Sequence, residues 1–159
     1  MRSDWKKIRL GDVVKINGLS YSNKGNWTFA NYLDTGNIVG NSIDTIQYID
    51  LLKEKLPSRA KRKVKYNSII YSTVRPNQRH YGIVKSAPGN FWVSTGFAVI
   101  DVDDELADAD YVYFFLTQAD IVESLHSIAE QSTSAYPSIS GSTQNKVYER
   151  FFMGILLYK

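Results

Sequence analysis

The densest group of hydrogen-bonding side chains in the sequence is a hexapeptide, Arg75 to His80, which reads Arg-Pro-Asn-Gln-Arg-His. In the major groove of DNA, arginine can donate two hydrogen bonds to guanine, and asparagine or glutamine can pair in the same bidentate way with adenine. Pro76 restricts the backbone, which lowers the entropy lost when such a loop binds. The residue types therefore predict a base-reading loop made by Arg75, Asn77, Gln78, Arg79 and His80.

An ordinary polar connection between two strands is the alternative interpretation of this hexapeptide. Arg75 could also serve the fold, as the ion-pair partner of an acid in the 101 to 110 region. Both interpretations of Arg75 stay open at this point, whereas Gln78 and Arg79 favour contact with DNA.

Charge is strongly segregated along the chain. From Lys55 to Ile100 there is no Asp or Glu, whereas from Ser86 to Asn145 there is no Lys or Arg, so the net charge of +3 conceals two segments of opposite sign. A separate basic segment is typical of proteins that bind a polyanion, and lysine and arginine supply affinity for phosphates. The predicted phosphate contacts are Arg59, Lys61, Arg62, Lys63 and Lys65; a solvated surface is the alternative.

Two further loops combine polar and aromatic side chains, at residues 21–27 and 132–138. Such side chains can hydrogen-bond phosphates or stack on bases. They provide secondary candidates for a DNA-facing surface, namely Tyr21, Asn23, Lys24, Ser134 and Tyr136.

Motifs for catalysis and cofactor binding are missing from the sequence. It contains no Cys, no glycine-rich phosphate loop and no dinucleotide fingerprint. The one dense carboxylate cluster, between Asp101 and Glu105, could attract a divalent metal, but a solvated turn is the simpler interpretation. We therefore expect a non-catalytic protein without a cofactor or metal. The absence of an apolar run of membrane-spanning length and of a signal-peptide core leads us to expect a cytoplasmic location.

Apolar periodicity predicts mostly strands followed by one main helix. The clearest strand is Ser68 to Val74, which is rich in β-branched and aromatic residues. Three- and four-residue spacing predicts a helix from about 110 to 130, capped by Asp108 or Asp110. Tyr48 to Lys55 suggests helical turns, and Tyr148 to Tyr158 a closing strand. We expect one α+β domain, 1–159, with a mixed, largely antiparallel or barrel-like sheet and without a spacer helix or second domain.

In the order of its motifs, the chain resembles the target recognition domain of type I restriction-modification specificity subunits. The resemblance runs through almost the whole chain, and its collinear pieces are Trp5 to Val13, Tyr32 to Ile38, Pro57 to Lys61, Ser72 to Pro76, Val93 to Phe97, the helix at Tyr111 to Glu130, and Tyr136 to Ser140. Two departures are Asn67-Ser68, where the family commonly has Gly-Asp, and the absence of its usual closing prolines after Gln144.

The resemblance implies sequence-specific recognition of double-stranded DNA without catalysis by this chain. Methyltransferase subunits, and a restriction subunit that can join them, are the implied partners. Three alternatives remain open: the recognition part of a fused restriction-methyltransferase, a protein-interaction or antirestriction module, and a nuclease. The acid-free basic segment makes the nuclease the least favoured of these.

Overall fold

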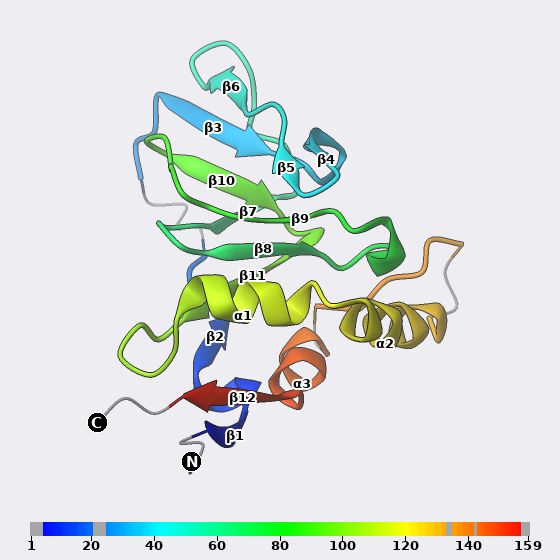
Figure 1. Ribbon diagram of the computed structural model, residues 1–159. Helices are drawn as coiled ribbons and strands as arrows, with labels where there is room; N and C mark the ends of the chain where they lie inside the picture. The colour runs from blue at the N-terminus through cyan, green and yellow to red at the C-terminus, as the bar shows by residue number, and fades with distance from the viewer. Residues whose placement is uncertain (1–4, 21–24, 133–134, 142, 157–159) are drawn as a thin grey trace.

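The computed structural model describes residues 5–20, 25–132, 135–141 and 143–156. Two four-stranded sheets form its centre (Figure 1). One has the strand order β6-β3-β10-β7 and the other β2-β11-β8-β9. The bounds of these eight strands are β2 Val14–Ile16, β3 Phe29–Leu33, β6 Gln47–Asp50, β7 Ala60–Lys63, β8 Ile69–Ser72, β9 Tyr81–Ile83, β10 Phe91–Ser94 and β11 Phe97–Val102.

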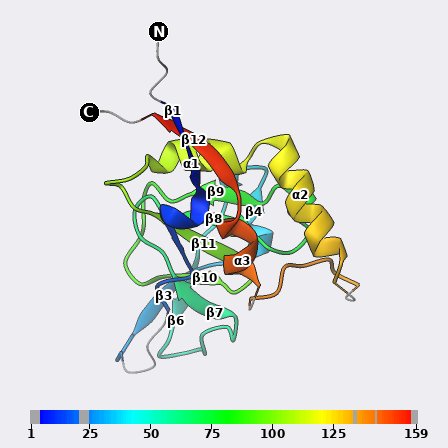
Figure 2. The ribbon, with the colours of Figure 1, turned by 90° about the horizontal axis from the view of Figure 1, so that it is seen from below.

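Smaller elements surround these two sheets. β1 (Trp5–Arg9) pairs with β12 (Phe152–Leu156), and β4 (Ile38–Val39) forms a hairpin with β5 (Ser42–Ile43). The α-helices are α1 (Ala109–Leu116), α2 (Ala119–Glu130) and α3 (Gln144–Glu149), and the 3-10 turns are η1 (Leu10–Asp12), η2 (Thr35–Asn37) and η3 (Pro76–Gln78). The view in Figure 2 shows α2 and α3 beside the β8–β11 sheet.

The core has layers because β8 and β11 are apolar on both faces. Ile70 and Val99 point into a cluster between the two large sheets, whereas Ile69, Tyr71 and their neighbours on β11 point toward the three α-helices. A third cluster, around Trp92, covers the outer face of the other sheet. Strands buried on both faces lack the usual polar alternation, which explains why residues 68–74 carry no charged side chain.

The predicted fold class is confirmed, since helices pack on sheets whose described strand pairs are antiparallel except for β3 with β10. The N-cap is Asp108, whose Oδ1 accepts a hydrogen bond from the Tyr111 backbone N–H at 2.9 Å. Within the described residues, no helix is long and apolar enough to cross a membrane.

Three predicted elements differ from the structure. The helix predicted at 110–130 is divided into α1 and α2, because the backbone of Gln118 is extended. Gln118 is the N-cap residue of α2, and its side-chain amide donates to the Phe114 carbonyl at 2.9 Å. Residues 47–50 form strand β6 instead of helical turns, because they pair with β3. Tyr148 belongs to α3, and the closing strand begins only at Phe152.

Candidate nucleic-acid interface

The strand directions bring several polar connections to one end of the two large sheets. β3 and β10 are parallel, β10 turns back into β11, and β11 is antiparallel to β8, so β3, β8 and β10 all finish at the same end. β7, antiparallel to β10, begins there. We call this the loop end; it carries residues 34–37, Arg59, 73–80 and 94–96, and lies on the right in Figure 1.

The predicted base-reading loop lies at the loop end, between β8 and β9. Arg75 and Arg79 both have left-handed backbone conformations, with φ of 46° and 57°, and they flank the single turn of η3. Asn77, Gln78 and Arg79 are exposed, whereas Arg75 and His80 are half-buried. Left-handed geometry is unfavourable for residues with a β-carbon, and such strain is concentrated at functional sites. The loop therefore has a defined shape that presents three polar side chains to solvent.

A second loop holds the first in place through backbone hydrogen bonds. The Arg75 N–H donates to the Pro137 carbonyl at 2.8 Å, and the Ile139 N–H donates to the Thr73 carbonyl at 2.9 Å. The Arg75 guanidinium lies 4.9 Å from the centre of the exposed Tyr136 ring. Tyr136, a secondary candidate, is thus part of the same surface as Arg75.

The Arg75 guanidinium packs on the Tyr136 ring and does not pair with an acid of the 101 to 110 region. Among the residues that the structure describes, Lys85 makes the ion pair with that region, its Nζ lying 3.0 Å from Asp110, and Arg75 makes none. The ion-pair alternative for Arg75 is therefore wrong. A guanidinium over a tyrosine ring keeps its hydrogen-bond donors directed outward, where a base or phosphate can reach them.

A cluster of tyrosines packs in the core next to β8, the strand that leads into the predicted base-reading loop. Tyr71 lies fully buried on β8, packs against Tyr81 and Tyr148, and donates from its hydroxyl to the Leu116 carbonyl at 3.1 Å. Tyr113 extends this cluster, and burial raises the pKa of its hydroxyl to about 12. Close-packed rings fix the strand that leads into the loop, so the loop is built on a rigid base.

The basic segment is divided by the fold. Arg59 lies at the loop end, where its carbonyl accepts the Thr95 N–H at 2.9 Å. Lys61 is exposed at an irregularity in the β7–β10 pairing. Lys65 lies at the opposite end, on the connection that leads into β8. The predicted phosphate contacts therefore do not form one continuous surface with the base-reading loop.

Arg62 and Lys63 are both half-buried and are held by other side chains. Arg62 Nη1 donates to Oε1 of the buried Gln144 at 3.0 Å, and burial lowers the pKa of this guanidinium. The ammonium of Lys63 lies 5.5 Å from the Trp27 ring and 5.2 Å from the Trp92 ring. Both cations thus take part in packing of the domain, and their predicted phosphate contacts stay a prediction.

We predict that Arg62→Ala acts mainly on stability. Loss of the charged hydrogen bond should lower the free energy of unfolding by about 1.5–3 kcal/mol, measured by urea unfolding, while affinity for DNA per folded molecule changes little. Lys61→Ala is the matched control, because its exposed side chain should leave stability within about 0.5 kcal/mol. If Arg62→Ala leaves stability unchanged but binds DNA much more weakly, Arg62 is a phosphate contact instead.

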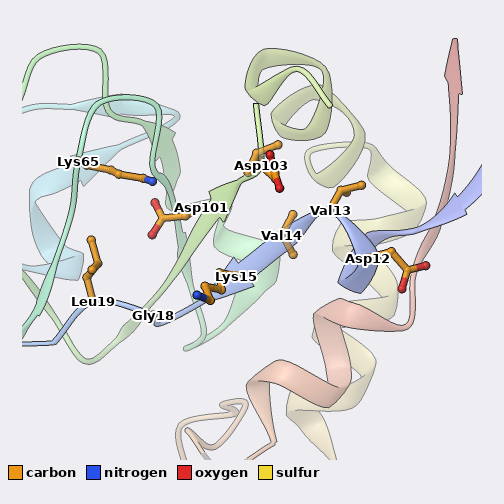
Figure 3. Close-up of a pocket in the computed structure, with 10 residues that line it drawn as sticks. Asp12, Val13, Val14, Lys15, Gly18, Leu19, Lys65, Asp101 and Asp103 are labelled. Atoms are coloured by element: carbon orange, nitrogen blue, oxygen red, sulfur yellow. The ribbon is translucent and has the colours of Figure 1, made fainter. Parts of the chain in front are cut away.

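The position of Lys65 is explained by the acids that face it. Lys65 lines an open pocket of about 440 Å³ together with Lys15 and Asp101, and Figure 3 shows its side chain pointing toward the Asp101 carboxylate. Asp101 accepts a 2.6 Å hydrogen bond from the Ser68 hydroxyl, which itself accepts the Lys65 N–H. Asp101, near the end of β11, thus holds the turn at residues 65–68 through Ser68, at the end opposite the predicted base-reading loop.

The structure also reveals a close approach that the sequence did not indicate. A methyl group on Gly96 would lie 2.8 Å from Arg59 Nη2 and from Thr35 Cγ2. The Gly96 carbonyl accepts both the N–H and the hydroxyl of Thr73, at 2.9 and 3.0 Å. Gly96 therefore joins η2, Arg59 and the end of β8. Residues 91–101 read as one strand in the sequence, whereas the structure ends β10 at Ser94 and begins β11 at Phe97, with Gly96 in the turn between them.

The remaining secondary candidates, Tyr21, Asn23, Lys24 and Ser134, lie outside the described residues. The loop end thus contains six primary candidates, which are Arg59, Arg75, Asn77, Gln78, Arg79 and His80, with Tyr136 beside them. Its exposed donors and acceptors are suited to a polar polyanion with hydrogen-bonding edges.

Comparison with known proteins gives concordant results. Residues 2–151 match the model of the type I restriction modification DNA specificity domain. The type I restriction enzyme HindI specificity subunit of Haemophilus influenzae is 28% identical over 140 residues, which are 87% of this chain and 29% of that protein. This chain therefore spans less than a third of that curated relative.

Solved structures share the fold. The HsdS subunit from Thermoanaerobacter tengcongensis superposes with a TM-score of 0.77 at 20% identity, over 98% of this chain and 39% of that one. A second similar chain comes from a structure that concerns complex assembly and conformational transition of the type I R-M system. It superposes with a TM-score of 0.71 at 23% identity, over 95% of this chain and 37% of that one. Because the family model covers nearly the whole sequence, the chain belongs to the type I restriction modification DNA specificity domain family.

Proposed function

We propose that this domain recognises a specific sequence in double-stranded DNA, as the specificity module of a type I restriction-modification complex. The observation that carries the proposal is the loop end. There, a strained and anchored loop presents Asn77, Gln78 and Arg79 beside the Arg75–Tyr136 pair. These are the side-chain types that read base edges, and family membership supports the same role.

The proposal assigns recognition to this chain and chemistry to its partners. Methyltransferase subunits would modify the bound site, and a restriction subunit that joins them would cleave unmodified DNA; both act in the cytoplasm, where the genome lies. The relatives that match are themselves specificity subunits. Residues 1–159 would act as one recognition domain within that assembly.

The test is a selection from randomised DNA duplexes by the 159-residue chain, starting at low salt. We expect one sequence to be enriched, with an affinity that falls linearly with salt on logarithmic axes, by a slope of about 0.9 per neutralised phosphate. A single domain buries a small interface, so binding should be weak and low salt should be needed. Enrichment of no sequence at any salt concentration would contradict the proposal.

A further inference from the structure

A second pair of polar side chains lies at the loop end, where β3 ends and β6 begins. Asn37 finishes η2 directly after β3, and Gln47 begins β6. The β3–β6 register sets Gln47 opposite Tyr32, so the start of β6 lies beside the end of β3. Gln47 Nε2 donates to Asn37 Oδ1 at 3.0 Å, and Gln47 is exposed. Two amides distant from the predicted base-reading loop in sequence are therefore paired at the same end of the sheets.

This pair leaves hydrogen-bonding groups unused on both side chains. Among the described residues, neither the Asn37 amide hydrogens nor the Gln47 side-chain carbonyl oxygen has a hydrogen-bond partner. Adenine presents an acceptor, N7, and a donor, the N6 amino group, in the major groove. The Asn37 amide and the Gln47 carbonyl together supply the complementary donor and acceptor. A single Asn or Gln reads adenine with the same two groups.

The backbone around the pair is already fixed. The Asn37 N–H donates to the Asp34 carbonyl, and the Asp44 N–H donates to the Asn37 carbonyl, both at 3.0 Å. The Asp34 carboxylate accepts the Thr35 N–H at 2.8 Å, so this acid is engaged within η2. A site whose geometry exists before binding loses little entropy when it binds.

Arg59 connects this pair to the rest of the loop end. Its guanidinium and the Thr35 methyl group approach the same face of Gly96, and the Gly96 carbonyl holds Thr73 at the start of the other loop. A cation at this junction offsets the charge of Asp34 and attracts the DNA backbone. Gly96 thus lies beside Arg59, beside Thr35 of the η2 turn that ends at Asn37, and beside Thr73 at the start of the β8–β9 loop.

We propose that Asn37 and Gln47 form a second base-reading site, specific for adenine, which contacts the same duplex as Arg79. This inference rests on the proposed function, because it assigns part of the recognised sequence to these two amides. It adds two residues that the composition of the basic segment did not indicate.

The experiment repeats the duplex selection with the parent chain, Asn37→Ala, Gln47→Ala and Asn145→Ala. Asn145 is exposed on α3 and provides a control for the loss of an asparagine. We expect both amide variants to lose preference for adenine at one and the same position, by roughly five- to hundredfold, while the other positions of the enriched sequence persist. Asn145→Ala should select the parent sequence unchanged.

Asn37→Asp separates recognition from stability. Its carboxylate still accepts the hydrogen bond from Gln47, but the outward donor is gone, so adenine preference at that position should be lost without a change in melting temperature. If the parent enriches a sequence and both amide variants keep it in full, this inference fails while the proposed function stands. If the parent enriches nothing, both fail.

Discussion

Arg79→Ala is expected to reduce discrimination between the enriched DNA sequence and its single-base variants by about 1–3 kcal/mol. The loss should be confined to one or two positions of the DNA sequence. The left-handed backbone conformation of Arg79 fixes the direction in which its exposed side chain extends. Competition binding with a panel of singly substituted duplexes measures the effect. Arg79→Lys should lose most of the discrimination too, since lysine keeps the charge but cannot form the bidentate contact.

Two controls give this prediction its specificity. Arg9→Ala removes an exposed arginine of β1, whose Nη2 lies 3.8 Å from an Asp12 carboxylate, and should leave binding unchanged. Lys61→Ala should weaken binding to all sequences alike and reduce the salt slope by about one phosphate. An Arg79→Ala variant that behaves like Lys61→Ala would assign Arg79 to the backbone and leave base reading to other residues.

Trp92→Ala is expected to lower the free energy of unfolding by about 3–5 kcal/mol. Trp92 is 1% exposed, packs edge-on against Trp27 at 5.9 Å, and fills the cluster on the outer face of the β3–β10 sheet. Its removal leaves a cavity and takes away one of the two rings beside Lys63. Because domains of this size are typically stable by about 5–15 kcal/mol, the variant should be marginal in urea titrations.

Trp5→Ala is the matched control for this prediction. Trp5 is 54% exposed on β1, so its loss should change the unfolding free energy by much less than the loss of Trp92. Trp92→Phe should fall between the two, because a smaller ring still fills part of the space. Equal effects at positions 5 and 92 would contradict the role of the outer cluster.

The strands that carry the site were predictable because their signal is local. Residues 68–74 are uncharged and rich in β-branched side chains, and β8 is buried on both faces. Asp108 was predictable as a cap for a similar reason, since a capping side chain binds a backbone N–H three residues later. The break at Gln118 was not, because Phe115, Ala119 and Val122 continue a three- and four-residue apolar spacing across it.

The division of the basic segment could not be predicted, because it depends on partners far away in the sequence. Arg62 bonds Gln144, 82 residues later, whereas its neighbour Lys63 points to two tryptophans. Lys65 looks identical in the sequence but lies at the opposite end of the sheets. A count of positive charges predicts an affinity for phosphate; only the strand order decides which of those charges share a surface.

The anchoring of the β8–β9 loop has a consequence for how new DNA targets arise. The loop is held by main-chain atoms of Thr73, Arg75, Pro137 and Ile139, which every residue except proline can supply as donors. Substitutions at positions 77 and 78 can therefore change the side chains that face a base without breaking the backbone hydrogen bonds that hold the loop. Positions 75 and 79 tolerate less, since their left-handed backbones disfavour β-branched residues and admit asparagine or glycine readily. Under the proposed function, a few point changes in this connection would be enough to alter the DNA sequence that the domain recognises.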